Sequence, residues 1–365
     1  MEKVIPSYYN KFQCTASACS DNCCIGWEID VDEETLGKYR ELDKVAEFPI
    51  MSHIEMEGED AHFVLGEEER CPFLNEENLC RLQAAYGEEV LCRICQLHPR
   101  FIHEYGNRME IGLDLCCEEA TRLILSQETL PILRVEHGED GENVAEEEPL
   151  YPVLEPCRSR MFAYMSETDE PLTQMMGRLL AYCDVVEEQL LFGAEKEAVG
   201  EFSVEECQLP TNAYRILSPT KEYYGECIAF LRRRIPLSVS WHNFLADVAT
   251  DLDAIWEKKN EFHQQYPDFE NHGKQLLHHY TYRYFMEGIW DGGVFCQFFV
   301  GVFMVRMIEL LDVAWYHYHG TFSFEDQVWI CTQMAKELEY SEENLEAVLA
   351  FGVEGGENFA VDLCD

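Results

Sequence analysis

The sequence has little positive charge. Its 365 residues include 27 Lys and Arg side chains against 70 Asp and Glu, which gives a formal net charge of −43. Such a chain repels phosphate backbones, so we predict no nucleic-acid partner. The charge would attract a lysine-bearing partner, but on charge alone a solvated acidic surface that keeps the protein in solution is the favoured explanation.

The sequence also lacks long apolar segments. Its start, MEKVIPSYYNKF, has no apolar core and no small-residue cleavage site, so we expect no secretory signal. The longest apolar run, residues 293–305, is too short to span a bilayer and predicts a buried helix. We therefore expect a cytoplasmic protein with no membrane partner, in a compartment that keeps thiols reduced.

Several nucleotide-binding and catalytic motifs are missing. The glycine pairs at 292–293 and 355–356 do not follow strand-like runs, so no doubly wound dinucleotide site is predicted. The chain has no P-loop and no H-E-x-x-H. It also lacks the Cys-x3-Cys-x2-Cys triplet that is usual in radical S-adenosylmethionine enzymes.

Cysteine is abundant and unevenly placed. Of 17 cysteines, seven are scattered singly after residue 150, as expected of small buried side chains. The other ten precede residue 118 in four clusters and are the candidate metal ligands: Cys14, Cys19, Cys23, Cys24, Cys71, Cys80, Cys92, Cys95, Cys116 and Cys117.

Short cysteine spacings let one loop offer two thiolates to one ion. Thiolate-rich sites select zinc or iron–sulfur clusters, and spacing alone does not choose between them. Adjacent cysteines point in different directions, so one can ligate while its neighbour packs or serves another centre. We predict that at least four of the ten bind metal.

The segment LCRICQLHPRF holds Cys92 and Cys95 in a C-x-x-C pattern. A redox pair would need a strand–turn–helix context that is not seen here, so a metal clip is favoured. His98 is a second candidate ligand or a turn residue before Pro99. Arg100 could hold a carboxylate or cover the core.

Periodicity predicts mostly helices. Helical signals lie at residues 28–39, 78–87 and 117–127, and a hairpin is predicted over 101–113 with its turn at Gly106-Asn107. After residue 149 nearly every segment is helical, and one continuous helical pattern covers 241–262. At most one of His278 and His279 is expected to face inward. The aromatic run Tyr280, Tyr282 and Tyr284 is favoured as core over a lysine-binding site.

The expected fold is mainly α. An irregular, cysteine-rich, metal-tied N-terminal module with a small hairpin (1–135) precedes an acidic linker (136–149) and packs on a helical C-terminal domain (150–365).

Four ordered segments resemble the flagellin lysine-N-methylase (FliB-like) family, within the broader cysteine-cluster proteins. They are FQCTASACSDNCCIGWEIDVD, CPFLNEENLCRLQ, LCRICQLHPRF and EIGLDLCCEEATRLIL, and YTYRYFMEGIWDG resembles a weaker family segment. Carried over by position, the family cysteines would be Cys14, Cys19, Cys23, Cys24, Cys71, Cys80, Cys95 and Cys117. Cys116 stands at a family serine position, Glu118 at a proline, and Cys92 is additional.

The resemblance implies methylation of lysine ε-amines on flagellin with S-adenosyl-L-methionine as donor and a cysteine-bound iron–sulfur cluster. With ten clustered thiols in a reducing compartment, it leads us to predict a [4Fe-4S] cluster. The donor pocket is expected at the junction of module and helical domain. The alternative is a non-enzymatic cysteine-cluster protein that binds zinc or iron.

Overall fold

The computed structural model describes residues 2–26, 29–58, 60–67, 70–137, 149–207, 214–236 and 238–353. The chain divides into two compact units. Unit 2 comprises residues 12–101 and 113–120, and unit 1 comprises residues 1–11, 102–112 and 121–365. Residues 138–148 of the predicted acidic linker lie outside the described residues.

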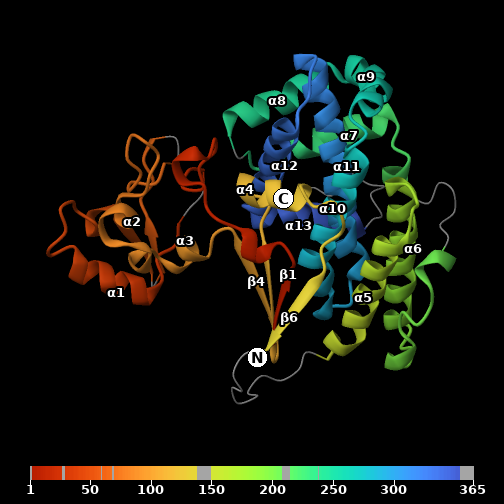
Figure 1. Ribbon diagram of the computed structural model, residues 1–365, viewed down its shortest axis with the longest axis horizontal. Coiled ribbons are helices and arrows are strands. Elements are labelled where there is room, and N and C mark those ends of the chain that lie inside the picture. The colour runs from red at the N-terminus through yellow and green to blue at the C-terminus, as the bar shows by residue number, and fades with distance from the viewer. Residues whose placement is uncertain are drawn as a thin grey trace. The chain divides into compact units, whose positions relative to one another are not determined.

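Unit 1 is mainly helical, as predicted (Figure 1). Its helices are α5 (Tyr151–Glu167), α6 (Leu172–Leu191), α7 (Lys221–Leu231), α8 (Val239–Thr250), α9 (Leu252–Gln265), α10 (Phe269–Tyr284), α11 (Val294–His319), α12 (Phe324–Glu339) and α13 (Glu342–Val353). Several start at a side-chain cap that accepts a backbone N–H, which satisfies a donor the helix leaves open. These caps are Thr220, Ser238 and Ser323.

Helix α11 is the centre of unit 1. In Figure 1 it runs beside α10, and it contacts α6, α9, α12 and α13 as well. It is long and apolar enough to cross a membrane, yet 94% of its most apolar window is buried inside the protein. The predicted buried helix is confirmed, although it continues well past Val305 to His319 and so carries Arg306, Glu309 and Asp312 into the core.

Helices α10 and α11 approach closely at Gly301. A Cβ atom there would lie 2.8 Å from Cβ of Tyr280, closer than real carbon contacts. Because α10 is enclosed on most sides, Tyr280, Tyr282 and Tyr284 are core residues, as favoured. The expectation for His278 and His279 was wrong: both are buried, since neighbouring elements cover two faces of this helix.

A four-stranded sheet completes unit 1, in the order β4-β5-β1-β6. The predicted hairpin is confirmed as β4 (Arg100–Tyr105) and β5 (Arg108–Leu113), with Gly106 at a φ of 58° in the turn. Strand β1 (Glu2–Pro6) pairs in parallel with β5 and antiparallel with β6 (Leu133–His137). Tyr282 of α10 donates its hydroxyl to the carbonyls of Val4 (3.0 Å) and Ile111 (3.4 Å), which ties the helix to the sheet.

Unit 2 is built from short elements. They are α1 (Glu33–Leu42), the β2–β3 hairpin (Ile54–Glu57 and Asp60–Phe63), α2 (Arg81–Tyr86) and α3 (Arg93–Leu97), and α4 (Glu118–Leu125) begins here and continues into unit 1. Its small apolar core includes Leu36, Tyr39, Phe63 and Phe73, and the last two rings meet edge to face at 4.9 Å. Cys71 and Cys92 belong to this core, so packing and thiol chemistry share one site.

Candidate functional site

Backbone pairing in unit 2 brings two cysteine clusters together. Ile25 forms an isolated bridge with Arg70, and the amide of Cys71 donates to the carbonyl of Cys24 at 2.9 Å. A second bridge joins Leu74 to Cys80. Segments about fifty residues apart in sequence therefore present their thiols at one place.

The C-x-x-C pair lies at the start of α3. Asp32 accepts the amide of Thr35 at the start of α1 and, through its other oxygen, the amide of Arg93 in α3. One carboxylate thus positions both helices, and although burial opposes its charge, these hydrogen bonds lower the pKa of Asp32. The Sγ atoms of Cys92 and Cys95 are 3.2 Å apart, and the hydrogen bond between them lowers the pKa of Cys92 and raises that of Cys95.

Six of the ten predicted thiols are close enough to act on one another electrostatically. Charge on Cys71 and Cys80 raises the pKa of Cys24, after the larger effects of a hydrogen bond with Cys23 and burial. Charge on Cys24 and Cys71 likewise adds to the rise at Cys95. Burial raises the pKa of Cys71 to about 12. The six are Cys23, Cys24, Cys71, Cys80, Cys92 and Cys95.

Two further thiols lie near Cys23. Burial raises the pKa of Cys117 to about 12, with smaller contributions from Cys19 and Cys23. Burial also raises the pKa of Cys19 to about 11, and its Sγ donates to Glu118 Oε2 at 3.4 Å. The same Glu118 accepts from the amide and hydroxyl of Ser20, which anchors the first cysteine loop.

The last two predicted ligands differ from these. Cys14 is exposed, and its sulfur accepts the amide of Ala16 at 3.4 Å. Cys116 is buried beside the half-buried Cys117, and its amide donates to Asp114. The adjacent pairs thus differ in burial within each pair, as expected of neighbours that point in different directions.

The spacing of the thiols limits the kind of centre that they can hold. The Cys23 and Cys24 sulfurs are 3.8 Å apart, and the Cys92–Cys95 distance is 3.2 Å. Across the described part of unit 2, however, no three sulfurs lie within 4.8 Å of one another. A zinc ion bound by three or four thiolates at about 2.3 Å would need such a triplet. As placed, the thiols form close pairs rather than one closed set of three or four ligands.

Two further residues singled out in this segment, His98 and Arg100, follow α3 directly. His98 ends the helix and forms a cis peptide bond with Pro99. Arg100 lies over the ring of Phe12, with 5.4 Å between its guanidinium carbon and the ring centre.

Of the scattered cysteines, five are buried as expected and Cys296 is half-buried, while Cys364 lies outside the described residues. The five are Cys157, Cys183, Cys207, Cys227 and Cys331.

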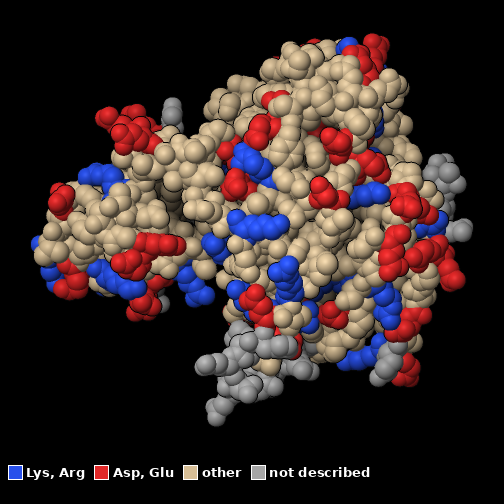
Figure 2. Space-filling view, in the orientation of Figure 1, with Lys and Arg blue, Asp and Glu red and all other residues tan. Residues whose placement is uncertain are grey.

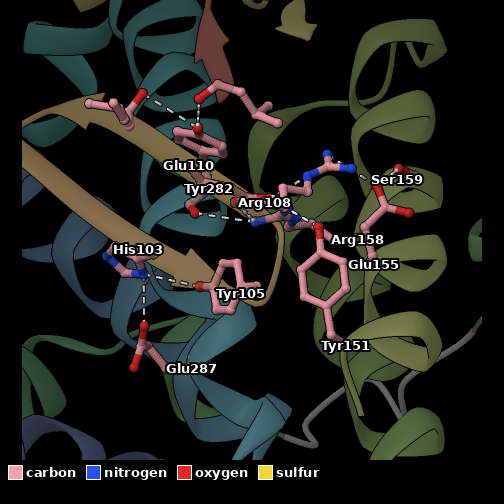
Figure 3. A network of polar contacts seen from close by, with 12 residues as sticks. His103, Tyr105, Arg108, Glu110, Tyr151, Glu155, Arg158, Ser159, Tyr282 and Glu287 are labelled. Atoms are coloured by element: carbon pink, nitrogen blue, oxygen red, sulfur yellow. Dashed lines mark hydrogen bonds and ion pairs between the residues drawn. The ribbon is translucent and has the colours of Figure 1, made fainter. Parts of the chain in front are cut away.

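Unit 1 contains a buried polar network that the sequence did not reveal (Figure 3). Arg158 of α5 donates to both oxygens of Glu110 on β5, at 2.5 and 2.7 Å. Arg108 (3.4 Å) and the Tyr151 hydroxyl (3.4 Å) approach the same carboxylate. Burial would raise the pKa of Glu110, but Arg158, Arg108 and, more weakly, His103 outweigh it and hold that pKa below its ordinary value.

Beside this network, His103 of β4 faces Glu287, which lies in the 3-10 helix Phe285–Ile289 that follows α10 (Figure 3). Its Nδ1 is 2.7 Å from Glu287 Oε1 and 3.1 Å from the Tyr105 hydroxyl. The three side chains form a partly exposed polar group at the edge of this network. Alternation of polar residues along the predicted hairpin was the only signal for it.

A cavity of about 620 Å³ lies within unit 1, lined by parts of α6, α9, α10, α11 and the segment before α7. Glu309 of α11 is at its inner end with Arg306, Lys259 and His263. Polar residues at intervals of three in an otherwise apolar helix were the available signal. The sequence did not predict this cavity, because the apolar run ends at Val305, before Arg306 and Glu309.

The two units together define a protein with a thiol-lined module and a helical unit that contains a small-molecule-sized cavity. Residues 184–359 match the family model described as the FliB lysine N-methylase C-terminal domain. A lysine-N-methylase of Salmonella typhimurium (strain LT2) is 35% identical over 130 residues, which cover 33% of this chain and 32% of that protein. The flagellar biosynthetic protein FliU of Salmonella muenchen is 35% identical over 131 residues, covering 33% of this chain and 75% of that protein.

These matches show that the chain belongs to the FliB-like lysine N-methylase family, as the cysteine motifs indicated. The chain aligns with only about a third of the length of the Salmonella typhimurium lysine-N-methylase. No solved structure matches the chain.

Proposed function

We propose that this protein is a cytoplasmic protein-lysine N-methyltransferase that uses S-adenosyl-L-methionine and modifies flagellin. Family membership supports the reaction, because the relatives carry the names lysine-N-methylase and flagellar biosynthetic protein. The net charge of −43 supports a lysine-bearing partner, because steering of this kind is long-range and weakens with salt. On the face seen in Figure 2, acidic and basic side chains are interspersed, so we assign the flagellin contact to no single patch.

A [4Fe-4S] cluster in unit 2 is part of the proposal. The observation that supports it is the gathering of six thiols from three sequence clusters, Cys23–Cys24, Cys71–Cys80 and Cys92–Cys95. Burial raises the pKa of Cys71, and the hydrogen bond with Cys92 together with burial raises that of Cys95, so a bound cation would favour their thiolate forms. Cys24, Cys71, Cys80 and Cys95 are the proposed ligands. When bound, the cluster would tie together the loops that carry the thiols.

In the proposed reaction the neutral lysine amine attacks the sulfonium methyl group. A C–N bond forms, the C–S bond breaks and S-adenosylhomocysteine leaves with the electron pair. The lysine ammonium must first lose its proton, to water or to a side chain beside the bound methyl donor.

The metal is tested first. Protein purified without oxygen should be brown and contain iron and acid-labile sulfide. A Cys95→Ser variant should lose iron, whereas Cys331→Ser, in the core of unit 1, should keep it. A colourless protein with stoichiometric zinc and no iron would point instead to the alternative, a zinc-binding protein.

The activity is tested by co-expression with the flagellin of the same organism and intact-mass analysis. Additions of whole methyl units on lysines, lost in Cys95→Ser, are expected. Unmodified flagellin, with cluster and donor both present, would refute the proposed activity.

A further inference from the structure

The cavity in unit 1 has the size and the lining of a small-molecule site. Its volume of about 620 Å³ lies within the usual range for ligand pockets. Leu217, Pro219 and Phe269 supply apolar surface, and charged side chains converge on it from α9, α10 and α11. Neither the cysteine module nor the His103 group includes any of these residues.

Cationic groups exceed acidic ones at the inner end. Glu309 Oε2 accepts from Arg306 at 2.9 Å, while Oε1 is 2.9 Å from His263 Nε2 and 3.2 Å from Lys259 Nζ. Burial opposes the charge of Glu309, but the hydrogen bond from His263 and the charges of Arg306 and Lys259 outweigh it and lower its pKa. One carboxylate therefore faces two permanent cations and a histidine.

Lys259 offers N–H donors at the inner end of the cavity beyond the one that its contact with Glu309 uses. Arg306 is held by the Thr173 hydroxyl and the carbonyls of Ile216 and Leu217, so it is a fixed part of the wall. An ammonium has three N–H donors, and the side chain of Lys259 is 25% exposed. Lys259 can thus bind an incoming carboxylate without leaving Glu309. Thr173, in the first turn of α6, also lines the cavity.

An acidic group lines the same cavity. Glu270, in the first turn of α10, accepts the amide of Leu172, and Lys274 lies 3.9 Å from it. A carboxylate has about four lone-pair sites, so these contacts leave room for a ligand ammonium. The lining thus offers partners for both charges of an amino acid, next to an apolar surface.

We propose that this cavity binds an α-amino-carboxylate group, with its carboxylate at Lys259 and His263 and its ammonium at Glu270. Resting on the proposed function, the ligand is the methyl donor, whose methionine part carries this group and whose remainder covers Leu217, Pro219 and Phe269.

The test is calorimetric titration of the full-length, iron-loaded protein with S-adenosylhomocysteine, L-methionine and L-lysine. Loss of one charge-assisted hydrogen bond should weaken S-adenosylhomocysteine binding about tenfold or more in Lys259→Met and in Glu270→Gln. Lys258→Met is the matched control, because this neighbour in α9 pairs with Glu261 instead, and its affinity should be unchanged. Unfolding curves check that all variants fold.

The outcomes separate the two proposals. Equal binding of S-adenosylhomocysteine by the wild type and all variants would overturn the cavity assignment and leave the proposed function standing. If the wild type neither methylates flagellin nor binds S-adenosylhomocysteine, but binds L-methionine or L-lysine in a way that depends on Lys259, the proposed function fails and the amino-acid site stands. If none of the three binds the wild type, the cavity assignment is wrong.

Discussion

Removal of the Arg158 guanidinium should destabilise unit 1 strongly. The Arg158 and Glu110 side chains are 1% and 2% exposed, and they share two hydrogen bonds. In Arg158→Met, the buried carboxylate would keep only Arg108 and Tyr151, each at 3.4 Å, too far to replace a bidentate partner. Breaking a buried pair from one side costs about 3–5 kcal/mol. Because Arg108 remains, we expect a loss at the lower end, about 3 kcal/mol.

The assay is urea unfolding followed by tryptophan fluorescence. Five of the six tryptophans lie in residues 121–365, so the signal reports on unit 1. Arg160→Met is the matched control, because Arg160 lies on the same helix but pairs with the exposed Glu201. Surface pairs of this kind contribute about 0–1 kcal/mol. A loss below 1 kcal/mol in Arg158→Met, or one equal to that of Arg160→Met, would refute the reasoning.

Two further measurements belong to this prediction. The double variant Glu110→Leu/Arg158→Met should be more stable than Arg158→Met alone, since no charge is left buried without its partner. The pKa of Glu110 is lower in the folded than in the unfolded protein, so the stability it contributes is present above about pH 4.5 and is lost as pH falls through the folded pKa. The difference in free energy of unfolding between wild type and Glu110→Gln should therefore become smaller below pH 4.

Three other outcomes are expected. Burial raises the pKa of Asp312 far above 3.8, so Asp312 destabilises the folded protein once pH rises past the pKa of this group in the unfolded protein. Asp312→Asn should therefore raise the free energy of unfolding at pH 7 by about 1 kcal/mol or more, and a gain that persists at pH 3 would contradict this. Gly301→Ala should cost about 1–3 kcal/mol through overpacking, whereas Gly37→Ala, which meets no atom within 4 Å, should gain about 0.5–1 kcal/mol in urea unfolding of unit 2. Limited proteolysis should cut Cys95→Ser within residues 12–101 before unit 1, and cleavage in the same order and rate as Cys331→Ser would show that metal and folding are not coupled.

Local signals in the sequence predicted local structure well. The acid-capped start near Asp32, the glycine stop at Gly87 and the turn at Gly106 all lie where the structure has a helix start, a helix end and a hairpin. Each depends on residues within one turn of the chain. The segment 241–262 is helical as its spacing indicated, and it divides into two helices, α8 and α9, which meet at Asp251 without a glycine or proline to mark the break.

Features that depend on residues far apart in the sequence could not be predicted from it. Strands β1 and β6 pair across more than 120 residues, and neither has an alternating pattern long enough to stand out. The partner of Glu110 is on a helix 48 residues later, and the acids and bases around Glu309 come from two helices. Clustering in the sequence selected ten thiols, and metal binding by them stays a prediction. The clustering could not predict that six of them gather while Cys14 stays exposed, because that depends on the bridges from Ile25 to Arg70 and from Leu74 to Cys80.

The threading of the two units constrains how the chain folds during synthesis. Unit 2 is finished when residue 120 has been made, but β1 lies between β5 and β6, and β6 ends only at His137. Strand β1 therefore cannot complete its pairing until the whole of unit 2 and strand β6 have left the ribosome. A metal-loaded unit 2 would already be compact by then and would hold residues 12 and 120, the two ends of the waiting segments, at a fixed separation. If the proposed cluster forms in unit 2, its insertion would in this way shorten the search by which the sheet of unit 1 closes.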